Sequence, residues 1–230
     1  MPHLRQVATI FDMENITISP KNIEKFQKCV MFIITDFGEK DMYKQCQTEQ
    51  SAARQREMEQ GLLRLMLKIP YDEISVENLC REIGAPRKSF YRYFSGKEGA
   101  LLSLIDHTLM DYDVYNTHKA SENDGSVVRY MEQVFDYWIQ HKELLDALEK
   151  SNLSGVLIQR AMVFTNDRDA LPNFLQIGDQ RLREYGQMFL VCGLMTMILQ
   201  WHHDRFYKSS EEMAQLAMYL FTQPLFGGKL

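Results

Sequence analysis

The chain has 230 residues, enough for one large domain or two smaller ones with a substantial buried core. Hydrophobic residues make up 45% of it and charged residues 25%, a balance that excludes a disordered, collagen-like or disulfide-scaffold protein. The formal net charge of −5 argues weakly, when taken alone, against nucleic acid as a partner, because a binding surface must neutralise phosphates.

That charge is unevenly distributed. Residues 51–105 carry nine Lys/Arg and seven Asp/Glu, whereas residues 106–230 carry eleven and seventeen. Within the basic segment, residues 87–97 contain four cations and no acid. The sequence therefore offers an anionic partner one small basic surface in an otherwise acidic chain.

Residues 1–50 give the least clear pattern. The apolar run 30–34 is too short to distinguish a strand from part of a helix. We treat 1–50 as an N-terminal extension of uncertain role, which either packs on the body or comes from an over-long gene assignment, since Met42 would also serve as a start.

The sequence shows no targeting or membrane-spanning segment. The N-terminus lacks the basic-then-apolar layout of a secretory signal. The longest apolar stretch, 188–199, is shorter than the ~20 residues that a membrane-spanning helix needs. We therefore expect a cytoplasmic protein.

Apolar residues recur three and four positions apart over most of the chain after residue 50, which is the period of an amphipathic helix. Polar stretches at 120–125 and 165–169 indicate loops. Ser209 and Glu212 fit a capping box at the start of a last helix. The chain is thus predicted to be all-α, with helices over about 51–67, 75–84, 97–118, 126–151 (with a bend near His141), 153–164 and 174–204 before that last one.

Residues 74–94 contain the feature most directly linked to function. Ser75 is a suitable N-cap for a helix of two to three turns, and Gly84 can supply the left-handed backbone that ends it. Pro86 lies in the turn, and a second short helix begins at Arg87. This order is that of a helix-turn-helix, whose second helix presents its N-terminal side chains to base edges in the DNA major groove.

The same segment resembles the DNA-binding domain of the TetR family of bacterial transcriptional regulators. The resemblance rests on the Phe-Tyr-Arg-Tyr-Phe run at 90–94 and on Lys97 and Glu98 after it. It implies an all-α, TetR-like fold, with a three-helix helix-turn-helix domain over 51–105 and a larger helical domain for effector binding and dimerisation over 106–230. It also implies a cofactor-free, ligand-responsive repressor that binds a palindromic operator as a homodimer.

By the same resemblance, the side chains at the start of the second helix contact bases, and those that follow contact phosphates. A cation at a helix N-terminus, such as Lys97, also suits phosphate. Two alternatives stay open: Tyr93 packs in the domain core, and Arg54 belongs to a solvated helix face. The expected DNA-binding residues are Arg87, Lys88, Ser89, Tyr91, Arg92, Tyr93, Lys97, Ser75 and Arg54. Ala85, Pro86 and Lys88 differ from the residues more common in the family, so the operator sequence is not predicted.

Aromatic and methionine side chains in 106–230 could line an apolar effector cavity between helices. Residues of these types at helical spacing are more often part of an ordinary core. The candidates are Tyr112, Tyr115, Met131, Phe135, Trp138, Met162, Phe164, Phe174, Tyr185 and Phe189. The last two helices resemble the dimer interface of the family, with candidates Phe189, Gly193, Met197, Trp201, Met213, Leu216 and Leu220.

No metal site and no enzymatic activity is predicted. His202 and His203 point about 100° apart on a helix and cannot easily chelate one ion. The sequence has no G-x-S-x-G, H-E-x-x-H or glycine-rich phosphate loop. Two alternatives to a DNA-binding regulator stay open: a TetR-like protein that acts through a protein partner, and a helical carrier or enzyme for small apolar molecules.

Overall fold

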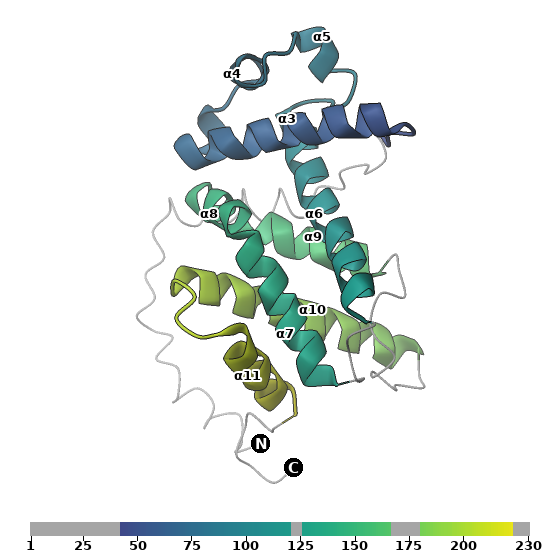
Figure 1. Ribbon diagram of the computed structural model, residues 1–230, viewed down its shortest axis with the longest axis vertical. Helices are drawn as coiled ribbons and strands as arrows, with labels where there is room; N and C mark the ends of the chain where they lie inside the picture. Colours follow the sequence, from purple (N-terminus) through teal and green to yellow (C-terminus); the bar gives the residue numbers. More distant parts are fainter. Residues whose placement is uncertain (1–41, 121–125, 167–179, 223–230) are drawn as a thin grey trace, which may run out of the picture. The chain divides into compact units, whose positions relative to one another are not determined.

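The computed structural model describes residues 42–120, 126–166 and 180–222, and every structural statement below concerns these residues. They form helices joined by short turns, and within them no strand forms beyond an isolated bridge between Tyr43 and Phe94 (Figure 1). The elements are α3 (Glu49–Lys68), η2 (Tyr71–Glu73), α4 (Val76–Glu82), α5 (Arg87–Phe90), α6 (Lys97–Ala120), α7 (Val127–Gln140), α8 (Lys142–Lys150), α9 (Ser154–Asn166), α10 (Gln180–His203) and α11 (Ser210–Thr222). The predicted all-α fold class is confirmed, while residues 1–41 and Phe174 lie outside the described part.

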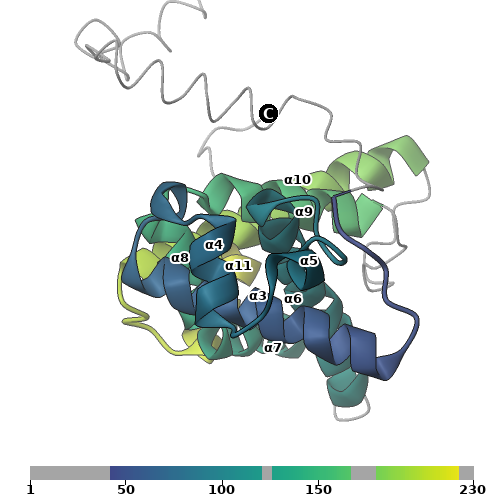
Figure 2. The ribbon, with the colours of Figure 1, turned by 90° about the horizontal axis from the view of Figure 1, so that it is seen from above.

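The helix-turn-helix forms for the local reasons that its sequence suggests. The Ser75 hydroxyl accepts a hydrogen bond from the Asn78 amide at 3.1 Å and so caps α4. Gly84 has a φ of 61°, the left-handed conformation that ends the helix before Pro86. Figure 1 shows α3, α4 and α5 grouped at one end of α6, and in the view from above these three helices lie nearest to the viewer (Figure 2).

An apolar core holds this unit together. Phe90 of α5 is fully buried and packs against Phe94, with ring centroids 5.1 Å apart. Ile74, Leu79 and Ile83 are also buried. The short helix α5 has only four residues, so its position depends on this packing rather than on its own hydrogen bonds.

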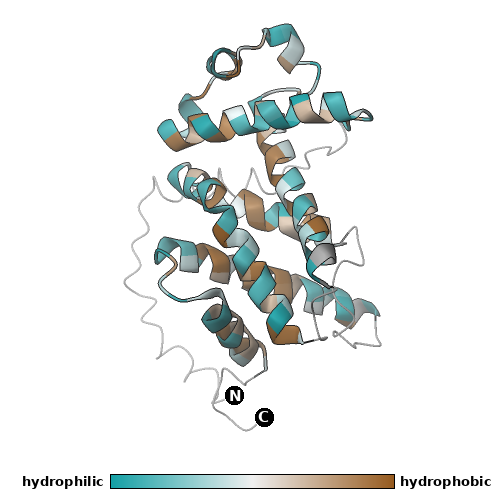
Figure 3. Ribbon diagram, viewed as in Figure 1, coloured by the Kyte–Doolittle hydropathy of each residue, from teal (hydrophilic) through white to brown (hydrophobic). Residues whose placement is uncertain are grey.

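The remaining helices pack in pairs. Helix α11 packs on α7, α10 on α9 and α9 on α6, while α8 contacts α3. Hydrophobic residues are concentrated along α9 and the middle of α10 (Figure 3). The predicted bend at His141 is confirmed, since the backbone leaves helical geometry there between α7 and α8.

Helix α6 is continuous from Lys97 to Ala120 and thus passes through the predicted domain boundary at 105/106. It contacts α3 at one end and α7 and α9 further along (Figure 1). The division into two domains stays a prediction, and α6 is the element that both would share. None of the described helices is long and apolar enough to cross a bilayer.

Candidate DNA-binding surface

Helix α5 and the turn after it carry an exposed group of cationic and hydroxyl side chains. Arg87, Lys88 and Arg92 are exposed, and Ser89 is half-buried. Tyr91 is 56% exposed although it directly follows the buried Phe90. The structure therefore brings together most of the side chains that the sequence predicted for DNA contact.

Arg87 has an internal partner that the sequence analysis missed. Its Nη2 donates to Glu77 Oε2 at 2.7 Å, and the other oxygen of Glu77 accepts from Arg81 Nη2 at 3.3 Å. Glu77 lies on α4, ten residues before Arg87, and so outside the cation-rich stretch 87–97. In the free protein, one cation of the surface is already paired.

Lys97, which the sequence predicts to contact phosphate, has partners within the protein, and its contact with phosphate stays a prediction. Lys97 Nζ donates to the carbonyl oxygens of Tyr71 at 3.0 Å and Asp72 at 3.3 Å, and it lies 4.5 Å from the centroid of the Tyr71 ring. Two of its three N–H donors are thus used inside the protein. Through these hydrogen bonds, the side chain connects η2 to the start of α6.

The two tyrosines of the 90–94 run have different surroundings. Tyr93 is 8% exposed, and its ring lies 6.3 Å from that of Phe94. Tyr93 therefore follows the core alternative, and Tyr91 is the tyrosine that faces solvent.

Ser75 and Arg54 also have contacts within the protein. The Ser75 hydroxyl caps α4, as described above. Arg54 forms an ion pair with Glu57 one turn further along α3. This pairing agrees with the alternative that Arg54 belongs to a charged helix face.

A cavity of about 80 Å³ lies between α6, α7, α9 and α10. Its lining residues are Leu109, Tyr112, Asp113, Tyr130, Val134, Trp138, Ala161, Phe164, Thr165, Val191, Leu194 and Met195. On each helix these positions are spaced by one, three or four residues, so each helix contributes one face. This spacing is the signal that could have identified the full lining.

The cavity combines apolar walls with hydroxyl groups. Burial raises the pKa of both Tyr112 and Tyr130 above the ordinary tyrosine value, so both hydroxyls stay protonated. Asp113 contributes a carboxylate to the lining. Such a cavity suits a small, largely apolar molecule with a polar group.

Only three of the predicted cavity residues line it: Tyr112, Trp138 and Phe164. The others in the described part do not line this cavity, and a role for them in effector binding stays a prediction. Met131 and Phe135 are core residues, Tyr115 packs on Tyr137, and Met162 contacts the Cys192 thiol, while Tyr185 and Phe189 are exposed on α10.

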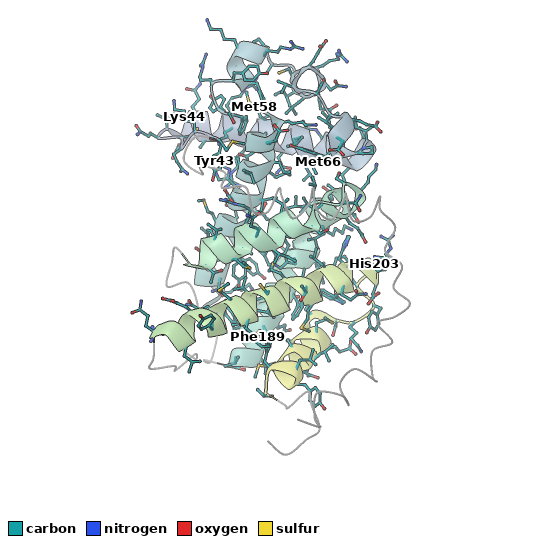
Figure 4. The ribbon with its side chains drawn as sticks, turned by 180° about the vertical axis from the view of Figure 1, so that it is seen from behind. Tyr43, Lys44, Met58, Met66, Phe189 and His203 are labelled. Carbon is teal, nitrogen blue, oxygen red and sulfur yellow. The ribbon has the colours of Figure 1, made fainter. Side chains whose placement is uncertain are left out.

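Helices α10 and α11 carry an exposed apolar face. Tyr185 is 72% exposed and Phe189, labelled in Figure 4, is 65% exposed. Phe189 packs edge-on against Phe221 of α11. The exposed apolar side chains of the two helices are Leu182, Tyr185, Met188, Phe189, Leu216 and Tyr219. Gly193, Met197 and Leu220 are partly exposed.

Two predicted dimer residues are corrected because they are buried within the chain. Trp201 packs against Phe135 at 5.4 Å between ring centroids, and its indole N–H donates to the Lys208 carbonyl. Met213 is 4% exposed.

His202 and His203 contact carboxylates on α8. His202 Nε2 lies 2.8 Å from Asp146 Oδ1, and His203 Nδ1 lies 2.6 Å from Glu149 Oε1. The described residues contain no cluster of His, Cys, Asp or Glu arranged to hold a metal ion.

Residues 61–104 match the sequence model of a family described as bacterial regulatory proteins, tetR family. The matched range covers the second part of α3, all of α4 and α5, and the start of α6. No curated protein sequence matches the chain.

Three solved structures match most of this chain, at low sequence identity and with TM-scores under 0.5. The fatty acid degradation regulator FadR from Bacillus halodurans is 14% identical, with a TM-score of 0.49 over 75% of this chain and 96% of that one. A TetR transcriptional regulator from Streptococcus agalactiae 2603V is 16% identical, with a TM-score of 0.49 over 76% and 96%. A TetR/AcrR family regulator from Thermobifida fusca YX-ER1 is 16% identical, with a TM-score of 0.38 over 74% and 97%.

These likenesses carry no residue roles, and the assignment rests on the family match to the helix-turn-helix. Residues 61–104 therefore form a segment similar to the DNA-binding part of bacterial regulatory proteins of the tetR family.

Proposed function

We propose that the chain is a ligand-responsive transcriptional repressor that binds a palindromic operator as a homodimer. The observation that carries the proposal is the exposed group of Lys88, Tyr91 and Arg92 on a short helix and the turn after it, which a buried aromatic core holds in place. Cations and hydroxyls on a rigid recognition helix can contact both base edges and phosphates. Arg87 joins them when DNA phosphate or a base replaces Glu77 as its partner.

The homodimer is proposed from the apolar face of α10 and α11. A monomer rarely leaves side chains such as Tyr185 and Phe189 together in water, and such a face marks a protein interface. A two-fold axis through it pairs the same surface on both chains and gives two copies of α5. Two such helices suit half-sites separated by about one DNA turn, roughly 34 Å.

The cavity supports the ligand response. Its walls include α6, whose first residue, Lys97, lies a few residues after the recognition helix α5. A ligand that prefers one arrangement of these helices would favour dimers whose α5 copies no longer match the operator spacing. Repression would be relieved only to the extent of that preference.

The proposal is tested by selecting duplexes from a random DNA pool with the full chain and measuring their affinity against salt. We expect enrichment of a palindrome and a steep fall of affinity with salt, because phosphate contacts release counterions. Changing Arg87 and Lys88 together to Ala should weaken specific binding about a hundredfold and leave the dimer mass in sedimentation unchanged. The matched control changes two exposed cations elsewhere, Arg129 and Arg205, to Ala. Equal binding by the two double variants would refute the site.

One observation favours a second candidate. Arg87 is paired with Glu77 and Lys97 is turned inward, so two of the four cations in 87–97 are engaged within the protein. A TetR-like protein that acts through a protein partner has no need of them. Absence of duplex binding even at low salt would favour this second function.

A further inference from the structure

Residues 42–47 form an extended segment that precedes α3. We call it the strap. It runs beside the end of the recognition segment, by which we mean α5 and the turn after it. The Met42 carbonyl accepts a hydrogen bond from the Ser95 amide at 3.0 Å, and the Lys44 amide donates to the Tyr93 carbonyl at 2.8 Å. The strap thus pairs with the residues that join α5 to α6.

A glycine in α6 permits this close approach. A Cβ atom placed on Gly99 would lie 2.1 Å from the Met42 carbonyl oxygen. Any side chain there would displace the backbone of the strap. The position of the strap therefore depends on α6 as well as on its own hydrogen bonds.

The side chain of Tyr43 connects the strap to α6 and α9 (Figure 4). Its hydroxyl donates to Asp106 Oδ2 at 2.6 Å. Asp106 is buried in α6, and Arg160 of α9 donates to both of its oxygens, each at 2.7 Å. We call Tyr43, Asp106 and Arg160 the interlock, because each comes from a different segment.

A second set of buried polar groups runs beside the interlock. The Cys46 thiol contacts Gln55 Oε1 at 2.8 Å, and Gln55 in turn donates to Ser103 Oγ at 2.9 Å. Ser103 donates to Glu59, whose carboxylate also contacts His107. These bonds connect Cys46 of the strap to α3 and, through Gln55, to α6.

The interlock is sensitive to the loss of any one partner. Burial raises the pKa of the Tyr43 hydroxyl, and the neighbouring Asp106 carboxylate raises it further, so this group donates its proton and does not ionise. A buried carboxylate that loses a donor keeps its charge without full compensation. The three side chains therefore hold their segments at one separation.

We infer that Tyr43, Asp106 and Arg160 are positioning residues that tie α9, one wall of the cavity, to the recognition segment through the strap. Arg160 is followed directly by Ala161, which lines the cavity, so a ligand that shifts α9 also shifts the guanidinium that holds Asp106. The strap then carries the shift to the backbone of Tyr93 and Ser95. This inference rests on the proposed function.

Hydrogen exchange in the DNA-free full chain tests the connection directly. Tyr43→Phe and Arg160→Gln should each speed exchange about tenfold in peptides that cover residues 42–48 and 91–96, with no change in α11, because a hydrogen bond to a charged group is lost. The matched controls are Tyr207→Phe and Arg129→Gln, which alter exposed side chains of the same types. Unchanged exchange in both peptides would overturn the interlock.

DNA binding separates positioning from general stability. With duplexes selected by the unaltered chain, Tyr43→Phe should lower affinity for the selected duplex about tenfold more than affinity for a scrambled one. An equal loss on both duplexes would reveal a merely structural effect and overturn the inference. In the double variant, Tyr43→Phe with Arg160→Gln, the loss of affinity should be smaller than the sum of the losses in the two single variants, since both act through Asp106. Failure of the unaltered chain to select any duplex would refute the proposed function, and the exchange experiment would still decide whether the interlock exists.

Discussion

Arg87 Nη2 lies 2.7 Å from Glu77 Oε2, so the first cation of the recognition helix is paired with α4 before any DNA arrives. Both side chains are more than half exposed, and an exposed pair of this kind is worth little. DNA can therefore displace Glu77, although its carboxylate still repels nearby phosphates.

Changing Glu77 to Gln should strengthen binding to scrambled duplex DNA. The variant loses one negative charge and frees Arg87, so we expect about one more phosphate contact. The slope of log affinity against log salt concentration should then be steeper by about one unit. Fluorescence anisotropy at several salt concentrations measures both quantities. Glu143→Gln, which removes an exposed acid from α8, is the control, and equal behaviour of the two variants would contradict the prediction.

Loss of the hydroxyl should have unequal effects at Tyr91 and Tyr93. Tyr91→Phe removes a group that faces solvent and should weaken duplex binding by about 1 kcal/mol. Tyr93→Phe changes a buried ring and should have a smaller effect on affinity. Titrations of both variants with the same selected duplex compare them, and a larger loss for Tyr93→Phe would contradict this reading of the surface.

The sequence predicted the helix-turn-helix well because short-range chemistry forms it. The cap at Ser75 and the left-handed turn at Gly84 each depend on a few consecutive residues. The partner of Arg87 was not predicted because Glu77 approaches it only when α4 and α5 pack together. The partners of Lys97 were not predicted for the same reason, since they are carbonyl groups that carry no mark in the sequence.

The cavity was predicted less well because residue type does not specify which way a helix faces. Phe135 and Trp138 lie three residues apart on α7, yet Trp138 lines the cavity and Phe135 packs against Trp201. The interlock could not be predicted at all. Tyr43 is 63 residues from Asp106, and no periodic pattern connects them.

Gly99→Ala should destabilise the protein, although Ala is ordinarily the better helix former. The added Cβ meets the Met42 carbonyl, and forcing an atom into packed backbone costs about 1–3 kcal/mol. Urea unfolding followed by circular dichroism gives the difference. At Gly96 a Cβ meets only the carboxylate of Glu98, a flexible group, so Gly96→Ala should cost less. The reverse order would indicate that the strap does not lie against α6.

Trp138 should report on occupation of the cavity. A neutral phenol combines an apolar ring with one hydroxyl and is a suitable first probe for these walls. We expect its addition to change tryptophan emission in the unaltered chain and in Trp201→Phe, but not in Trp138→Phe, because only Trp138 lines the cavity. A response that persists without Trp138 would place the probe elsewhere.

The start of α11 should weaken in acid. The Ser209 amide donates to Glu212 Oε2 at 2.8 Å, and the Glu212 amide donates to Ser209 Oγ at 3.2 Å, which confirms the predicted capping box. The bond from the Ser209 backbone lowers the pKa of Glu212, so its stabilisation is present above the ordinary glutamate pKa and is lost as pH falls through the lowered value. Amide exchange of the first turn of α11 against pH measures this, and Glu212→Gln should remove the dependence. A persistent acid transition in that variant would point to another group.

The distance along the chain between Asp106 and Arg160 has a consequence for how the protein is made. The two residues are 54 positions apart, and domains form from the N-terminus as the chain leaves the ribosome. The helix-turn-helix is therefore complete in sequence well before α9 emerges to supply its guanidinium. A chain whose synthesis stopped before Arg160 would contain the whole recognition surface but would lack the guanidinium that helps to position it.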